Sequence, residues 1–328
     1  MTADRATDQA LDQATGGASG QAVDQTAGRG GDRTGTRTGD APLGFVYAVL
    51  AYLCWGVLPL YVKAVEHMSP AEVVAHRCLW AVPVAGAVLW WTGRTSDLWA
   101  ALRRPRQLGM AAVTAALVTT NWGIYVWAVF ADRAVDAALG YYINPLFNIL
   151  LGALLLGERL TRLQIGAVAL AGLAVVVLAV GLGRLPIVPL GIVFSWGAYA
   201  YFKKQLPIGP NQGFLLEVLL ISGPALALVL VLAARGEGHF GTNVPDTLLL
   251  MLGGVLTATP LMLYANGAKL LRLSTIGILQ YITPTMIFLV AVFIFGEPVG
   301  TARAIALPMI WVALALYTTS LFRETSRR

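Results

Sequence analysis

The chain has 328 residues, of which 57% are hydrophobic and 12% are charged, and its formal net charge is +6. Soluble globular proteins carry charge on roughly a quarter of their residues, so this composition indicates a membrane protein and argues against a soluble catalyst. The basic residues form no stripe interleaved with aromatic residues, so nucleic acid is not an expected partner. Long apolar runs, rather than short alternating segments, favour an all-α polytopic fold over a barrel.

The first 42 residues form a polar segment that is rich in Asp, Gln, Thr, Gly and Ala and contains no aromatic residue. Such a composition cannot bury enough apolar surface to fold, and we expect a disordered N-terminal tail over 1–42. The segment lacks the apolar stretch of a secretory signal, and its six Asp residues are unlike a transit peptide.

Ten apolar runs follow the tail, each long enough to cross a hydrocarbon core that requires about 20 helical residues. With the N-terminus in the cytoplasm, the segments on that side carry 17 Lys and Arg residues, and the opposite loops carry five. This asymmetry predicts that both termini are cytoplasmic. The predicted spans are 44–65, 70–92, 107–130, 134–156, 163–182, 186–206, 212–234, 246–270, 273–295 and 302–322.

The two halves of the span region repeat each other. A shift of 139 residues aligns 142–145 (Tyr-Ile-Asn-Pro) with 281–284 (Tyr-Ile-Thr-Pro), and a shift of 141 aligns the Trp-Gly pair at 55–56 with that at 196–197. Tryptophan, tyrosine and proline recur in the same order, which indicates a duplication.

Each repeat contains five predicted spans, and because five is odd the second copy enters the membrane in the opposite direction. Such 5+5 inverted repeats place a substrate site near the bilayer midplane, where the halves meet. The expected organisation is a tail over 1–42, a first five-helix repeat over 43–182, a second over 183–322, and a short basic C-terminal tail over 323–328.

His76 and Arg77 lie about two turns into the second predicted span. An ionisable group there costs about 2.5–3.5 kcal/mol unless it faces a partner or a wet cavity. One interpretation is a recognition site for an anionic or carboxylate-bearing solute, with His76 as a candidate proton carrier. The other is a structural arginine that caps helix carbonyls, with His76 packed beside it.

Glu217 lies in a Leu-rich run of the seventh predicted span. Desolvation there would let its carboxyl group exchange protons near neutral pH. The alternative is an ion pair near the helix start with Lys203 or Lys204.

Amides, phenols and two matched tryptophans recur in the spans. The polar groups either bond between helices, at about 0.6 kcal/mol each, or line a wet cavity that holds a solute. Trp55 and Trp196 are interpreted either as cavity walls or as rings packed on the glycines that follow them. The polar candidates are Asn121, Tyr125, Tyr142, Asn144, Tyr264, Gln280 and Tyr281.

Pro145 and Pro284 lie inside the fourth and ninth predicted spans, where each is a candidate hinge or a static kink. Glu158 and Glu297 lie at span ends and are interpreted as structural. We find no phosphate-binding loop, paired-carboxylate arrangement or metal-ligand cluster, so no catalytic residue, cofactor or metal is expected.

Several motifs resemble RarD-type proteins of the EamA family, in the drug/metabolite transporter superfamily. The resemblance covers about 44–322 and implies a ten-helix transporter of the plasma (inner) membrane. The chain departs from the family pattern at Ala81 and Phe130, where the family usually has polar residues. The motifs are Ala-His-Arg at 75–77 with Trp80, 139–145, 156–159, and 273–275 with 280–282.

We therefore predict a secondary transporter of small organic solutes, such as amino-acid-like metabolites or amphipathic drugs, that works by alternating access in the export direction. The alternatives are, in order, a channel or passive facilitator, a membrane enzyme, and an assembling or regulatory membrane partner. The expected partners are the solute and membrane lipid, with protons as a candidate coupling ion. The sequence leaves solute identity, coupling, and the choice between monomer and dimer open.

Overall fold

The computed structural model describes residues 41–325, except 92, 94–97, 99–101, 158, 269 and 272. Within these residues the fold is all-helical, without a strand, as predicted. Most of the predicted N-terminal tail, Glu158 and the end of the C-terminal tail lie outside the described residues. The first described helix begins at Pro42.

Several helices have a proline at their first or second position, where a backbone N–H group would have no acceptor within the helix. Helix α8 begins instead with a capping box between Thr161 and Gln164. A turn at Val57 divides the first predicted span into two helices. The helices of the first half are α2 (Pro42–Gly56), α3 (Leu58–Ala64), α4 (Pro70–Trp91), α6 (Pro105–Phe130), α7 (Ala134–Leu156) and α8 (Arg162–Leu182).

The second half follows the same order, but its fourth span is interrupted. A turn at Gln280 and Tyr281 separates α12 from α13, and a short π-helical segment ends the span. The elements are α9 (Ile187–Gln205), α10 (Pro210–Arg235), α11 (Val244–Ala268), α12 (Leu273–Leu279), α13 (Ile282–Leu289), η1 (Val290–Ile294) and α14 (Gly300–Thr325).

Nine candidate spans in the described residues are long and apolar enough to cross a membrane. The remaining predicted span, 186–206, is the sixth in chain order and corresponds to α9, which does not reach this standard. Its last turn carries Lys203 and Lys204, which lower its apolar character. Helix α9 packs against α6 and α7.

The outer faces of the helices are apolar. The Trp91 side chain is 86% exposed, and those of Val180 and Phe293 are exposed to a similar degree. Exposed apolar surface on this scale is unfavourable in water and is expected of a protein surrounded by lipid. The described residues thus form a multi-pass membrane protein.

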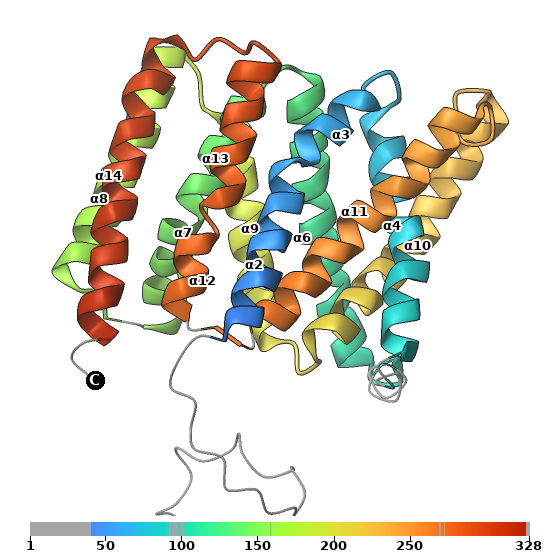
Figure 1. The fold of residues 1–328 in the computed structure, drawn as a ribbon, viewed down its shortest axis with the longest axis horizontal. Helices are drawn as coiled ribbons and strands as arrows, with labels where there is room; N and C mark the ends of the chain where they lie inside the picture. The colour runs from blue at the N-terminus through green and yellow to red at the C-terminus, as the bar shows by residue number, and fades with distance from the viewer. Residues whose placement is uncertain are drawn as a thin grey trace, which may run out of the picture. The chain divides into compact units, whose positions relative to one another are not determined.

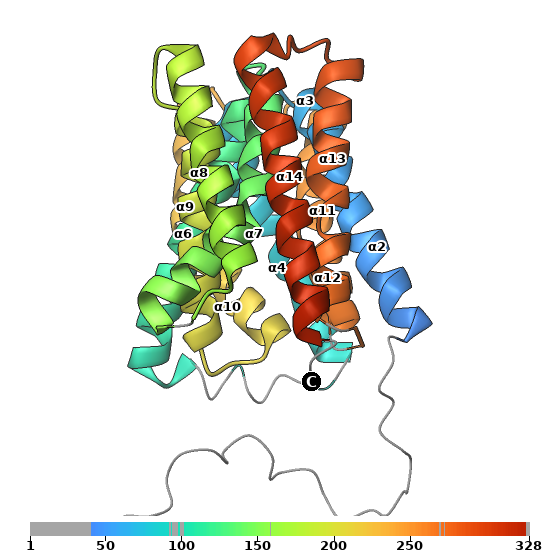
Figure 2. The same ribbon diagram turned by 90° about the vertical axis from the view of Figure 1, so that its left-hand side faces the viewer.

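Helices α8 and α14 pack together at one side of the bundle, and α4 packs with α10 and α11 at the other (Figure 1). Between them lie α2, α6, α7, α9 and α13, which surround the centre (Figures 1 and 2). Glycines allow the closest approaches: a Cβ atom at Gly254 of α11 would overlap the backbone of Trp80 in α4. Small residues at helix contacts are the usual solution in membranes.

A candidate solute cavity

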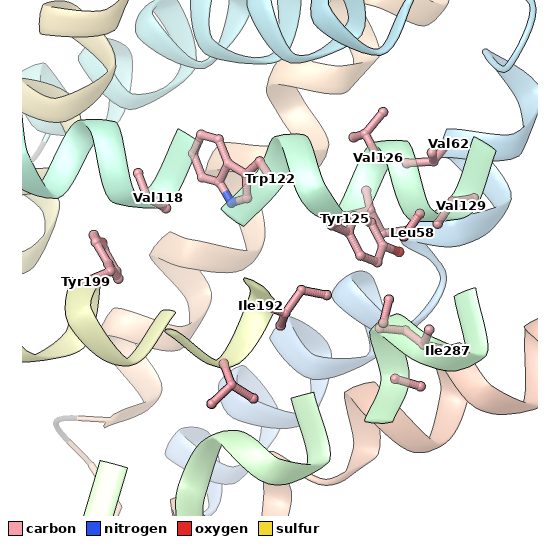
Figure 3. Close-up of a cluster of buried hydrophobic side chains, with 14 of the residues drawn as sticks. Leu58, Val62, Val118, Trp122, Tyr125, Val126, Val129, Ile192, Tyr199 and Ile287 are labelled. Atoms are coloured by element: carbon pink, nitrogen blue, oxygen red, sulfur yellow. The ribbon is translucent and has the colours of Figure 1, made fainter. Parts of the chain in front are cut away.

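A cavity of about 130 Å³ lies among α2, α4, α6, α7, α9 and the α11–α13 region. Its lining is mostly aromatic rings, amides and hydroxyls, with Arg77 as the one charged side chain among the described lining residues. Figure 3 shows some of the apolar lining residues, with Val118, Trp122 and Tyr125 along α6, Tyr199 on α9, and Leu58 and Ile287 on the side of Tyr125.

The cavity brings together several residues that the sequence predicted as a site and leaves others outside. The predicted residues in the lining are Trp55, Arg77, Asn121, Tyr125, Asn144, Trp196 and Gln280. Those outside the lining are His76, Tyr142, Glu217, Tyr264 and Tyr281.

Arg77 is 2% exposed, and its guanidinium group is held by one neutral partner. Its Nε atom donates to Thr257 Oγ1 at 3.0 Å, and its Cζ atom lies 5.4 Å from the Trp122 ring centroid. Its Nη1 atom is buried without a hydrogen-bond partner, and no described carboxylate forms an ion pair with it. A buried cation in this setting is a costly arrangement.

Asn121 is a junction between helices. Its Nδ2 atom donates to Ser195 Oγ at 2.9 Å and to the Ile192 carbonyl oxygen at 3.2 Å, and its Oδ1 atom accepts from the Tyr141 hydroxyl. These bonds join α6, α9 and α7, so the amide is largely occupied by the fold although it borders the cavity.

Tyr125 and Asn144 are the opposite case. The Tyr125 hydroxyl and the Asn144 Oδ1 atom are buried and have no hydrogen-bond partner. Because buried polar groups normally have partners, orphaned atoms in a cavity wall are candidates for contact with a bound molecule.

The matched tryptophans lie in the lining, and each has an aromatic neighbour. Trp55 lies 5.8 Å from both Tyr52 and Tyr264, ring centre to ring centre, so Tyr264 stands beside a wall residue rather than in the wall. Trp196 lies 5.4 Å from Tyr199.

His76 lies next to Arg77 in sequence but faces elsewhere. Its ring stacks on Phe240 at 4.9 Å, in the connection between α10 and α11, and both ring nitrogens lack a partner. Successive residues of a helix point about 100° apart, which explains the separation of these neighbours.

Tyr142 and Tyr281 also lie outside the lining. Tyr142 shares a hydrogen bond of 2.7 Å with Thr285 Oγ1, which ties α7 to α13. The Tyr281 hydroxyl is buried without a partner.

Glu217 forms an ion pair with Lys203, as the second interpretation of its sequence position expected. It is 1% exposed, its Oε1 atom lies 2.6 Å from Lys203 Nζ, and its Oε2 atom accepts from the Tyr199 hydroxyl at 3.3 Å. Tyr199 lines the cavity, so its side chain lies between this ion pair and the cavity.

The two candidate hinge prolines have different surroundings. Helix α7 continues through Pro145, whereas Pro284 is the third residue of α13, which follows the turn at Gln280 and Tyr281. Pro284 has no N–H group to donate to the carbonyl of Gln280, so the turn falls where the helical hydrogen bond is missing. Gln280 and Pro284 both line the cavity.

Glu297 caps a helix of the other half. Its carboxylate accepts from the backbone N–H groups of Ala134 and Val135 at 2.8 and 2.9 Å, at the start of α7. Burial raises the pKa of the Glu297 carboxyl group, and the two backbone donors oppose that shift because they stabilise the carboxylate. Nearby, Asp136 accepts from Arg133 and Arg303.

The cavity also includes residues that the sequence reasoning missed. The repeat itself was the signal that could have found them: Tyr141 stands 139 residues before Gln280, and Tyr199 stands 141 after Leu58. Most described lining residues fall into such pairs: 55 and 196, 58 and 199, 118 and 257, 122 and 261, 141 and 280, 144 and 283, 148 and 287.

The chain is similar to one protein family and to several of the curated bacterial proteins. Residues 42–180 match the EamA-like transporter family. Protein RarD of Streptomyces exfoliatus is 39% identical over 286 residues, which cover 87% of this chain and 90% of that protein. Protein RarD of Escherichia coli strain K12 is 36% identical over 84% of this chain and 93% of its own length.

A protein described as an uncharacterized transporter of Vibrio cholerae is 38% identical over 85% of this chain and 93% of its own length. One crystal structure superposes with a TM-score of 0.57 at 19% identity, covering 85% of this chain and 98% of its own. At that identity the superposition establishes the fold alone.

Proposed function

The chain belongs to the EamA-like transporter family, in its RarD group, and from this membership we propose that it is a secondary transporter of small organic solutes that works by alternating access. Amino-acid-like metabolites and amphipathic drugs are the solute classes proposed from sequence, with export as the direction. The observation that carries the proposal is the cavity whose walls come from paired positions of both halves.

We propose further that the fold is a ten-span 5+5 inverted repeat over 43–182 and 183–322, with both termini cytoplasmic. The packing supports it. Gly56 of α2 lies against Met286, and Gly197 of α9 lies against Phe147. These two contacts join repeat-equivalent positions, since 56 and 197 differ by 141 and 147 and 286 differ by 139.

The ion pairs that join the proposed halves, among the described residues, gather where α4, α7, α11 and α14 begin. There Asp136 pairs with Arg303, Glu72 with His239, and His67 with Asp246. In the proposed topology this end is exterior, so these pairs and the Glu297 cap hold the exterior side closed. Outward opening must break them, as alternating access by rocking requires.

The experiment is counterflow in proteoliposomes that contain the full chain and are preloaded with a mixture of metabolites and drugs. A carrier gives saturable exchange, because each solute occupies one site. Non-saturating flux without exchange would instead indicate the alternative, a channel or passive facilitator. Chemical conversion of a solute would indicate an enzyme.

Protons are the proposed coupling ion, and Glu217 is the candidate proton site because Tyr199 links it to the cavity. We expect a pH gradient to stimulate counterflow in the native protein but not in Glu217→Gln. Glu237→Gln, at an exposed position between α10 and α11, is the matched control. Equal stimulation in all three proteins would remove Glu217 from the coupling mechanism.

A further inference from the structure

We infer that the solute is a small organic monoanion with a single planar ring, whose carboxylate lies at Arg77. The inference rests on the proposed function and specifies its substrate class. It follows from the charge, the ring content and the size of the cavity.

Arg77 is buried in the cavity wall, and no described carboxylate pairs with it. The buried carboxylates of the described chain are engaged elsewhere. Glu217 pairs with Lys203, Asp136 with Arg303, Glu72 with His239, and Glu297 with backbone amides of α7. The compensating negative charge at Arg77 is therefore supplied by the solute.

The same observation disfavours a cationic group on the solute. No acidic side chain lies among the described lining residues, so an ammonium group would find no counter-charge there. It would also be confined with the Arg77 guanidinium in about 130 Å³, where like charges repel strongly at low dielectric. A net monoanion therefore suits the site better than an amine or a zwitterion, so the inference narrows the solute classes proposed from sequence and sets zwitterionic amino-acid-like metabolites aside.

The size and the walls of the cavity point to one ring. A dry cavity of about 150 Å³ holds benzene, and the 130 Å³ here is close to that volume. Trp55, Trp122 and Trp196 supply flat faces for stacking.

Two orphaned atoms complete the recognition. The Tyr125 hydroxyl can donate to the carboxylate, and the Asn144 Oδ1 atom can accept from a hydroxyl group on the ring. A hydroxylated aromatic carboxylate therefore satisfies the groups that the fold leaves without partners.

The test measures binding to the purified full chain in lipid nanodiscs, by calorimetry, with four probes that share a phenol ring, of which the benzoate and the benzamide are also isosteric. These are 4-hydroxybenzoate (an anion), 4-hydroxybenzamide (neutral), tyramine (a cation) and tyrosine (a zwitterion). We expect 4-hydroxybenzoate to bind at least about tenfold more tightly than each of the others, as a charge-assisted hydrogen bond implies. Equal binding of the amide, tighter binding of tyramine or tyrosine, or no binding of any probe would overturn the inference.

Variants then assign the preference to Arg77. Arg77→Gln should abolish the anion preference, and Arg77→Lys should retain part of it because the charge remains without the planar fork. Arg184→Gln removes one positive charge at an exposed position outside the cavity and should leave the preference unchanged. Survival of the preference in Arg77→Gln would overturn the assignment; if that variant does not fold, the four-probe comparison on the native protein still decides the solute class.

Counterflow of 4-hydroxybenzoate separates this inference from the proposed function. Anion-selective binding without counterflow would contradict transport while supporting the ligand class. Saturable counterflow of other solutes, without anion preference in binding, would support transport and contradict the ligand class.

Discussion

Lys203 and Glu217 show how a charged pair is accommodated inside a helical membrane protein. Their 2.6 Å contact joins α9 to α10, and Tyr199 adds a hydrogen bond to the same carboxylate. A buried pair adds little net stability, but loss of one partner leaves an uncompensated charge.

We expect Lys203→Met to destabilise the protein by about 3–5 kcal/mol, because Glu217 would remain buried without its cation. The adjacent, exposed Lys204→Met should change stability by no more than about 0.5 kcal/mol. Unfolding in detergent measures both, and the double variant Lys203→Met/Glu217→Gln should recover much of the loss. Equal stability of the two single variants would contradict this account of the pair.

Two tyrosines distinguish a residue that serves the cavity from one that serves the fold. The Tyr125 hydroxyl has no partner, so Tyr125→Phe should leave stability unchanged while it weakens solute binding. Tyr142→Phe removes the bond to Thr285 and should cost about 1 kcal/mol of stability with transport retained. Unfolding and counterflow measurements on both variants check the contrast, and the reverse pattern would exclude Tyr125 from the site.

At the scale of elements, α12 and α13 differ from their counterpart α7. Both regions carry a proline at equivalent positions, yet α7 is continuous and the second region turns at Gln280 and Tyr281. The turn lies in the cavity wall, where a conformational change can alter access to the solute.

We predict that Pro284→Ala lowers the counterflow rate severalfold without loss of stability, because alanine restores an N–H group and favours a continuous, stiffer helix. Pro308→Ala in α14, outside the described cavity lining, is the matched control and should leave the rate unchanged. A similar rate in native protein and in Pro284→Ala would mean that the turn is a static feature.

At the scale of the whole molecule, the number of spans determines on which side of the membrane the C-terminus lies relative to the N-terminus. Ten spans place both termini on one side of the membrane, whereas a chain in which α9 does not cross places them on opposite sides. Helix α9 falls short only in apolar character, and it packs against α6 and α7 as a spanning helix would.

We therefore expect reporter fusions at the N- and C-termini to report the same, cytoplasmic side. A fusion in the connection between α8 and α9 should report the exterior, and one between α9 and α10 the cytoplasm. Opposite sides for the two termini would contradict both the ten-span topology and the inverted repeat.

The sequence by itself determined the membrane class, the family and nearly all helix positions, because apolar run length, proline placement and motif order are local properties of the chain. It also identified Trp55, Trp196 and Asn144 as candidates through the 139- and 141-residue shifts, and Arg77 as an ionisable residue inside a predicted span; all four line the cavity.

Only the tertiary structure decided which neighbours share a face. In the structure His76 stacks on Phe240, whereas Arg77 lines the cavity. Glu217 forms an ion pair with Lys203. The tertiary structure also occupied Asn121 with three bonds and left Tyr125 without one. The physical reason is that a side chain's partner depends on helix rotation and on contacts between residues distant in sequence, which no local pattern encodes.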